Sequence, residues 1–131
     1  MKIPLDVLAK TKGFNEKDME IMKAHALEGY KILKEEGLLF SSWLAINHHQ
    51  FQKNKYPLTL PDFPIQVCEG TRLLLGIYPR IISLADHYDA LKRENDRFKR
   101  VPSYREAREI LTNTNKDQTY LINKLYSVGI F

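Results

Sequence analysis

Two adjacent histidines, His48 and His49, stand in the segment AINHHQFQKNKYP, and the chain also has His25 and His87. Helical proteins build iron, manganese and zinc sites from imidazoles and carboxylates that project inward from facing helices. Asp86 offers such a carboxylate. A single histidine on a helix is nevertheless more often an ordinary polar residue than a metal ligand. The pair alone therefore leaves both interpretations open.

The elements that must position these side chains are predicted to be helices. NEKDMEIMKAHALEGYKILKEEG has Asn15 as a plausible N-cap, acidic residues in its first turn and Gly37 at its end, which are the usual boundary signals of a helix. SSWLAINHHQFQ predicts a second helix, capped by Ser41 or Ser42, that carries both adjacent histidines. Neighbouring residues on a helix point about 100° apart, so the two imidazoles could face different ligands.

Proline and acidic residues mark the middle of the chain. Three prolines make residues 54–64 a loop, and residues 65–77 could form a short helix that Pro79 ends or kinks. RIISLADHYDALKREN then predicts a strong helix. Asp86 and Asp89 lie three residues apart on it and therefore share one face.

The last third of the chain also predicts helices. Ser103 followed three residues later by Glu106 forms a capping box before SYREAREIL, and residues 116–128 predict a final helix. No strand alternation, repeat or linker interrupts the pattern, so the sequence predicts one all-α domain over residues 1–131.

Composition limits the class of partner. The net charge of +4 and the pI near 9.1 suit anionic ligands such as nucleotides, but they say nothing about the fold. Acidic and basic residues are interleaved and nucleic-acid-binding motifs are missing, which speaks against a nucleic-acid binder. The chain has one cysteine, Cys68, and no apolar run near the ~20 residues of a membrane span. A cytoplasmic protein without a membrane segment is expected.

Five segments occur in an order that resembles the HD-domain phosphohydrolases, specifically their HD-GYP branch. They are MKIPLDVLAK, HALEGYKIL, NHHQ with KYP, RIISLADHYDAL and DRFKRVPSYREAREIL, and together they reach from Met1 to about Leu111. The resemblance implies an HD-domain-like helical bundle with divalent metals, usually iron or manganese, with zinc, nickel or magnesium as alternatives. It also implies hydrolysis of a cyclic dinucleotide such as cyclic di-GMP. The competing interpretation is a binding or regulatory module that has lost catalysis.

The resemblance also assigns roles to individual residues. The metal ligands it implies are His25, His48, His49 and Asp86, and the substrate-binding residues are Tyr56, Pro57, Arg97 and Arg100. Asp89 could accept a hydrogen bond from a ligand histidine, the usual support for such a ligand. It could equally pair with Arg93 as an ordinary helix carboxylate.

The chain departs from the family pattern at three places. Lys55 stands where the signature has glycine, and Gln50 replaces a glutamate that often follows the paired histidines. The family's His-Asp dipeptide and its lysine precede a segment like the one at Met1, so they are missing and no catalytic residue is assigned. We therefore expect an N-terminally truncated, weak or inactive fragment. Its exposed apolar faces would be covered by the missing segment or in a homo-oligomer.

Overall fold

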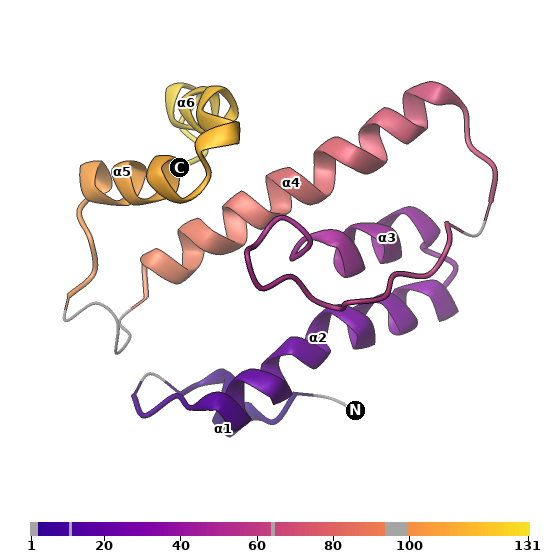
Figure 1. Ribbon diagram of the computed structural model, residues 1–131, viewed down its shortest axis with the longest axis horizontal. Helices are drawn as coiled ribbons and strands as arrows, with labels where there is room; N and C mark the ends of the chain where they lie inside the picture. The colour runs from indigo at the N-terminus through magenta and orange to yellow at the C-terminus, as the bar shows by residue number, and fades with distance from the viewer. Residues whose placement is uncertain (1–2, 11, 64, 94–99) are drawn as a thin grey trace. The chain divides into compact units, whose positions relative to one another are not determined.

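The computed structural model describes residues 3–10, 12–63, 65–93 and 100–131, and their regular elements are all helical (Figure 1). No strand occurs within these ranges, so the predicted all-α class is confirmed. None of the described helices has the length and apolar character needed to cross a membrane. The elements are α1 (Leu5–Leu8), α2 (Glu16–Glu35), α3 (Leu39–Asn47), α4 (Glu69–Leu91), α5 (Tyr104–Thr114), the 3-10 helix η1 (Lys116–Gln118) and α6 (Thr119–Ser127).

The start of α2 follows the predicted capping chemistry. The Asn15 side chain accepts a hydrogen bond from the Asp18 amide at 3.1 Å, and the Asp18 carboxylate accepts one from the Asn15 amide at 2.9 Å. Asp18 also pairs with Lys10 Nζ at 2.6 Å, although Lys10 lies before the helix. This reciprocal cap satisfies backbone donors that a helix start otherwise leaves unpaired. It therefore fixes where α2, the carrier of His25, begins.

The predicted limits of the second helix are wrong at both ends. The α3 helix begins at Leu39 with Leu38 as N-cap, and no side chain caps it, so neither Ser41 nor Ser42 is the cap. The Ser42 amide donates to the Leu38 carbonyl at 2.8 Å, which places both serines inside the first turn. At the other end α3 stops at Asn47. The adjacent histidines therefore follow the helix instead of lying within it.

The α4 helix corrects a second expectation. The sequence predicts a short helix over residues 65–77 that Pro79 ends or kinks, whereas α4 is one helix from Glu69 to Leu91 with Pro79 inside it, so the helix does not end there. Proline removes one backbone donor and normally breaks a helix. Here the ring of Pro79 is fully buried, so packing offsets that cost. Local propensity was overridden by burial.

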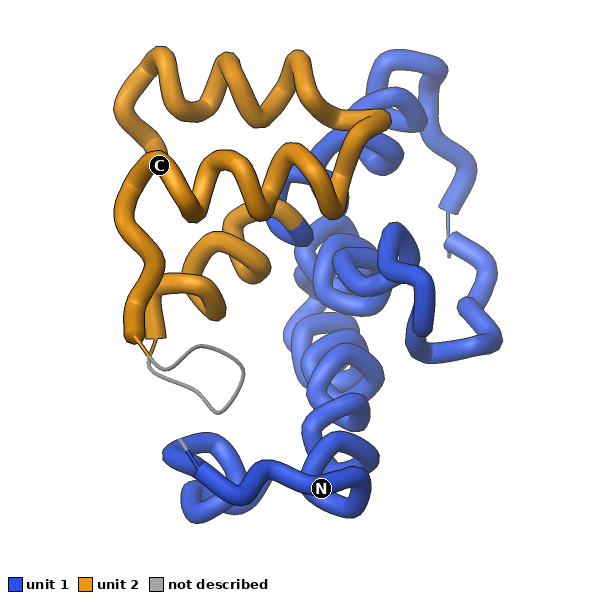
Figure 2. The backbone as a smooth tube through the Cα atoms, turned by 60° about the vertical axis from the view of Figure 1, so that its left-hand side comes forward, with its two compact units in different colours: residues 1–83 blue, residues 84–131 orange. Residues whose placement is uncertain are grey.

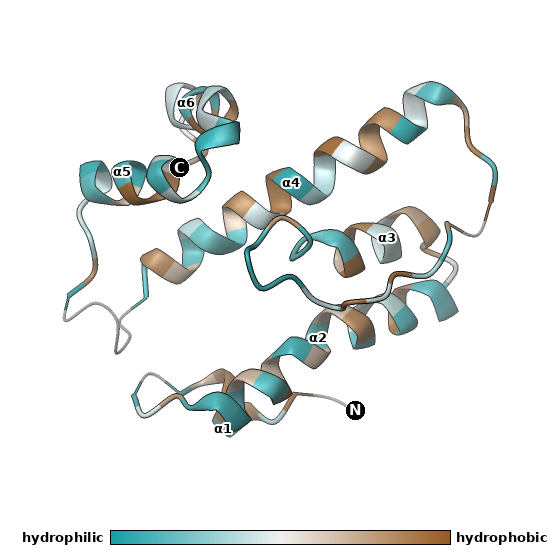
Figure 3. Ribbon diagram, viewed as in Figure 1, coloured by the Kyte–Doolittle hydropathy of each residue, from teal (hydrophilic) through white to brown (hydrophobic). Residues whose placement is uncertain are grey.

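The described chain forms two compact units, residues 1–83 and 84–131 (Figure 2). In the first unit α2 packs against α3 and α1 packs against α2. Hydrophilic and hydrophobic residues occur together along α2 and α5, whereas α3 is predominantly hydrophobic (Figure 3). The second unit has its own core, formed by Leu84, Leu91, Ala107, Leu111, Ile122, Leu125 and Tyr126. The prediction of a single domain over the whole chain stays a prediction.

A glycine on α2 offers a test of the α2–α3 packing. A Cβ added at Gly29 would meet the Cβ of Ala45 at 3.7 Å, which is ordinary van der Waals contact. Glycine in a helix interior costs about 0.5–1 kcal/mol relative to alanine. We expect Gly29→Ala to raise the free energy of unfolding by that amount in urea denaturation. Gly29→Leu should lower it instead, because the longer side chain would push against α3. If both variants were neutral, close packing at this point would be contradicted.

Candidate metal centre

Three histidines from different segments meet in the first unit. His25 lies on α2, His48 is the C-cap of α3, and His49 follows in the turn. Nε2 of His25 lies 3.1 Å from Nε2 of His48 and 3.1 Å from Nε2 of His49. His48 and His49 are buried, and His25 is half-buried. Of the four residues that are predicted to converge, the three histidines therefore lie together, and the convergence of Asp86 with them stays a prediction.

The turn that follows α3 orients both imidazoles toward α2. Gln50 holds this turn at two points, because its backbone amide donates to the Asn47 carbonyl at 3.0 Å and its side-chain amide donates to the Pro57 carbonyl at 2.8 Å. Asn47 in turn donates from Nδ2 to the Trp43 carbonyl at 2.9 Å. The histidines thus sit at the carboxyl end of α3, where the partial negative charge of the helix favours a cation.

Backbone carbonyls fix the orientation of two of the rings. Nδ1 of His25 donates to the Met22 carbonyl at 2.7 Å, and Nδ1 of His48 donates to the Ala45 carbonyl at 2.7 Å. A neutral imidazole that donates from Nδ1 carries a lone pair on Nε2. The Nε2 lone pairs of His25 and His48 therefore face each other at 3.1 Å. A hydrogen bond from Nδ1 to a backbone carbonyl is the usual second contact of a histidine that binds metal through Nε2.

His49 is held by a different partner. The side-chain amide of Gln52 lies 2.8 Å from Nδ1 of His49. Burial, together with the neighbouring His48 and His25, lowers the pKa of His49 to about 3. Its imidazole is therefore neutral at pH 7, and Nε2 carries the lone pair when the amide oxygen of Gln52, rather than its nitrogen, faces Nδ1. Sequence reasoning missed Gln52, although its position three residues after His49 was visible in the sequence.

The three nitrogens suit a divalent metal ion. Two ligand atoms about 2.1 Å from a shared ion lie about 3.0–3.4 Å apart for octahedral or tetrahedral geometry, and the two Nε2 separations from His25 are both 3.1 Å. Without a cation, facing lone pairs on buried rings are costly. Among the described residues, these are the histidine, cysteine, aspartate or glutamate side chains that come together in a group of three, with one possible ligand atom each and all three atoms within 4.8 Å of one another. The residues present therefore fit the metal that the sequence predicts.

The aromatic ring of Tyr56 packs against this centre. It stacks on His49 with ring centroids 4.2 Å apart and meets His25 edge-on at 6.0 Å. The following Pro57 is tied to the histidine turn through Gln50. Tyr56 and Pro57 thus border the cluster, and their predicted contact with substrate stays a prediction.

The predicted aspartates belong to the second unit. Asp86 lies on α4 with an exposed side chain, so its role as a fourth ligand stays a prediction. Asp89 is also exposed and forms an ion pair with Arg93 four residues later, which is the second of the two roles that the sequence left open. His87, the fourth histidine, lies 3.4 Å from the Asn115 side chain.

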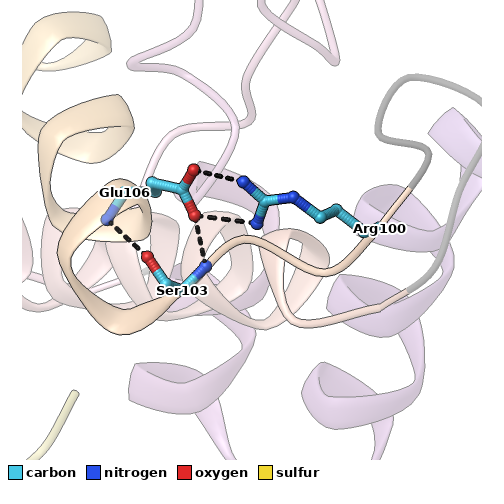
Figure 4. A network of polar contacts seen from close by, with 3 residues as sticks. All are labelled: Arg100, Ser103 and Glu106. Carbon is cyan, nitrogen blue, oxygen red and sulfur yellow. Dashed lines mark hydrogen bonds and ion pairs between the residues drawn. The ribbon is translucent and has the colours of Figure 1, made fainter.

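The predicted substrate-binding arginines have separate outcomes. Arg97 lies outside the described residues. Arg100 binds the Glu106 carboxylate through two nitrogens, at 2.9 and 2.5 Å, and the Ser103 amide donates to the same carboxylate at 2.8 Å (Figure 4). These contacts lower the pKa of Glu106 to about 2, with Arg100 as the main cause. Arg100 thus reinforces the capping box of α5, and its predicted contact with substrate stays a prediction.

A family model described as HD domain matches residues 4–91, about two thirds of the chain. The matched range contains α1 to α4 and all three clustered histidines. No curated protein and no solved structure matches the chain significantly.

Proposed function

Because the chain belongs to the HD domain family, whose members bind divalent metals and hydrolyse phosphate esters, we propose that it hydrolyses a cyclic dinucleotide such as cyclic di-GMP. The observation that carries the proposal is the cluster of three imidazoles, two buried and one half-buried, in which Nε2 of His25 lies 3.1 Å from Nε2 of His48 and of His49. The finer assignment to the HD-GYP branch is supported by the order of the sequence segments and by the Tyr-Pro pair beside the cluster.

Each residue of the site has a role in this proposal. His25, His48 and His49 would hold the ion, and the family order adds Asp86 as a fourth ligand. A bound divalent ion would acidify a water and neutralise phosphoryl charge. The Met22 and Ala45 carbonyls accept from Nδ1 of His25 and His48, so that in the neutral ring the lone pair lies on Nε2.

The rate of hydrolysis distinguishes two candidate functions, a phosphodiesterase and a module that only binds the dinucleotide. The sequence contains no His-Asp dipeptide, and Lys55 and Gln50 replace two residues of the family signature. No residue is therefore assigned as general acid or base. We propose turnover of cyclic di-GMP well below the ~1 per second that is common for enzymes. A module that binds the dinucleotide without hydrolysing it is the second candidate, favoured by the same departures.

The test is hydrolysis of cyclic di-GMP by the purified chain with added Mn²⁺ or Fe²⁺, followed by chromatography of the products. We expect slow, metal-dependent turnover that His25→Ala abolishes and that His87→Ala, a histidine outside the cluster, leaves unchanged. Cyclic di-GMP that binds without turnover would support the regulatory module. If the dinucleotide neither binds nor reacts in the presence of metal, the proposed substrate is wrong.

A further inference from the structure

A surface pocket of about 660 Å³ lies between α2 and the loop that follows the paired histidines. Three lysines line it: Lys23 comes from α2, and Lys53 and Lys55 come from the loop. One acidic residue, Glu20, shares the lining and pairs with Lys23 at 2.5 Å. Lys53 and Lys55 are exposed and form no ion pair with any described residue. The pocket therefore presents uncompensated positive charge, which suits an anionic ligand.

The rest of the lining is apolar. Ala24 and Leu27 of α2 and Leu58 of the loop contribute to it, and the side chain of Leu58 is 85% exposed. An exposed leucine alone needs no explanation. Beside two unpaired ammonium groups, however, the apolar wall suits a ligand that joins an anionic group to a flat or apolar moiety.

Tyr56 connects this pocket to the metal centre. It lines the pocket, and its ring also stacks on His49 with centroids 4.2 Å apart. Lys55 immediately precedes Tyr56 in the chain. One ligand could therefore place one phosphate at the histidine nitrogens and a second anionic group at the lysines.

We propose that this lysine pocket binds the second, non-reacting phosphate of the substrate and the base attached to it. The inference rests on the proposed phosphohydrolase function and names its substrate class: a molecule with two phosphate groups and an aromatic base. The lysine that replaces the signature glycine thus becomes a specificity residue. A solvated basic surface is the alternative, and it predicts no preference for doubly phosphorylated ligands.

The direct test uses inorganic pyrophosphate as the probe and metal-free protein, so that the histidine centre contributes nothing to binding. Calorimetry should show that Lys53→Ala, Lys55→Ala binds pyrophosphate at least tenfold more weakly than wild type, because two charge-assisted hydrogen bonds are lost. Lys53→Arg, Lys55→Arg should retain most of the affinity. Lys116→Ala, Lys124→Ala removes the same charge from exposed positions outside the pocket and should bind as wild type does. Equal loss in both alanine variants would overturn the inference.

A kinetic comparison separates this inference from the function on which it rests. For cyclic di-GMP the Lys53→Ala, Lys55→Ala variant should show a raised KM with kcat retained. For bis(p-nitrophenyl) phosphate, which carries one phosphate, KM should not change. An equal change in KM for both substrates would contradict a pocket for the second phosphate. Absence of all hydrolysis would reject the proposed function, whereas the pyrophosphate titration would still decide whether the pocket binds anions.

Discussion

The His48→Ala, His49→Ala double variant is expected to bind Mn²⁺, Fe²⁺ or Zn²⁺ at least about 100-fold more weakly than the wild-type chain. Changing a group that only orients a metal ligand typically costs 10–100-fold in affinity, and this variant removes two of the three clustered nitrogens. The remaining His25 cannot hold the ion alone, because stable sites use about four ligands. The measurement is competition with a metal-sensitive dye under anaerobic conditions for Fe²⁺.

The control for this experiment must separate lost ligands from lost fold. His87→Ala removes a histidine that lies outside the cluster and should bind metal as wild type does. His48→Gln, His49→Gln keeps polar side chains in the buried turn and should match the alanine variant in metal affinity, with a helical circular dichroism spectrum. Equal metal affinity in wild type and in both double variants would show that the histidine pair is not a metal site.

The metal-free chain is expected to lose stability as the pH falls below 6.5, and His49 should account for part of that loss. Burial lowers the pKa of His49 from 6.5 to about 3, so between these values the unfolded chain binds a proton that the folded chain does not. The free energy of unfolding therefore rises with pH across this window and falls on acidification, by up to about 1.4 kcal/mol per pH unit. Above pH 6.5 the contribution of His49 is fully present.

Urea unfolding of wild type and His49→Gln between pH 7 and 4.5 measures this contribution. Glutamine does not titrate, so the variant should show a shallower fall in stability over the same range. Glu106 has a lowered pKa of about 2, so its effect belongs to lower pH and is shared by both proteins. Added Zn²⁺ should raise the stability of wild type at pH 7 and make its fall on acidification steeper, because a bound cation excludes protons from the folded imidazoles while the unfolded chain still binds them. Identical profiles for the two metal-free proteins would contradict the buried neutral His49.

Local sequence signals were sufficient wherever a short-range contact decides the structure. The caps at Asn15 and at Ser103 with Glu106 were predicted correctly, since a cap joins side chains and amides only three residues apart. Helical periodicity likewise predicted the all-α class. The convergence of His25 with His48 and His49 came from a family resemblance, because nothing local joins residues 23 and 24 positions apart.

Tertiary structure decided what local patterns could not. Pro79 lies inside one helix because its ring is buried, although proline by itself predicts a break. Helix α3 ends at Asn47, and the turn that follows, held by Gln50 to the Pro57 carbonyl, aims both histidines at α2. The sequence was thus sufficient to identify the histidines as candidate metal ligands. Their geometry came from burial and from a hydrogen bond between residues seven positions apart, which depends on the path of the folded loop and which helical periodicity does not predict.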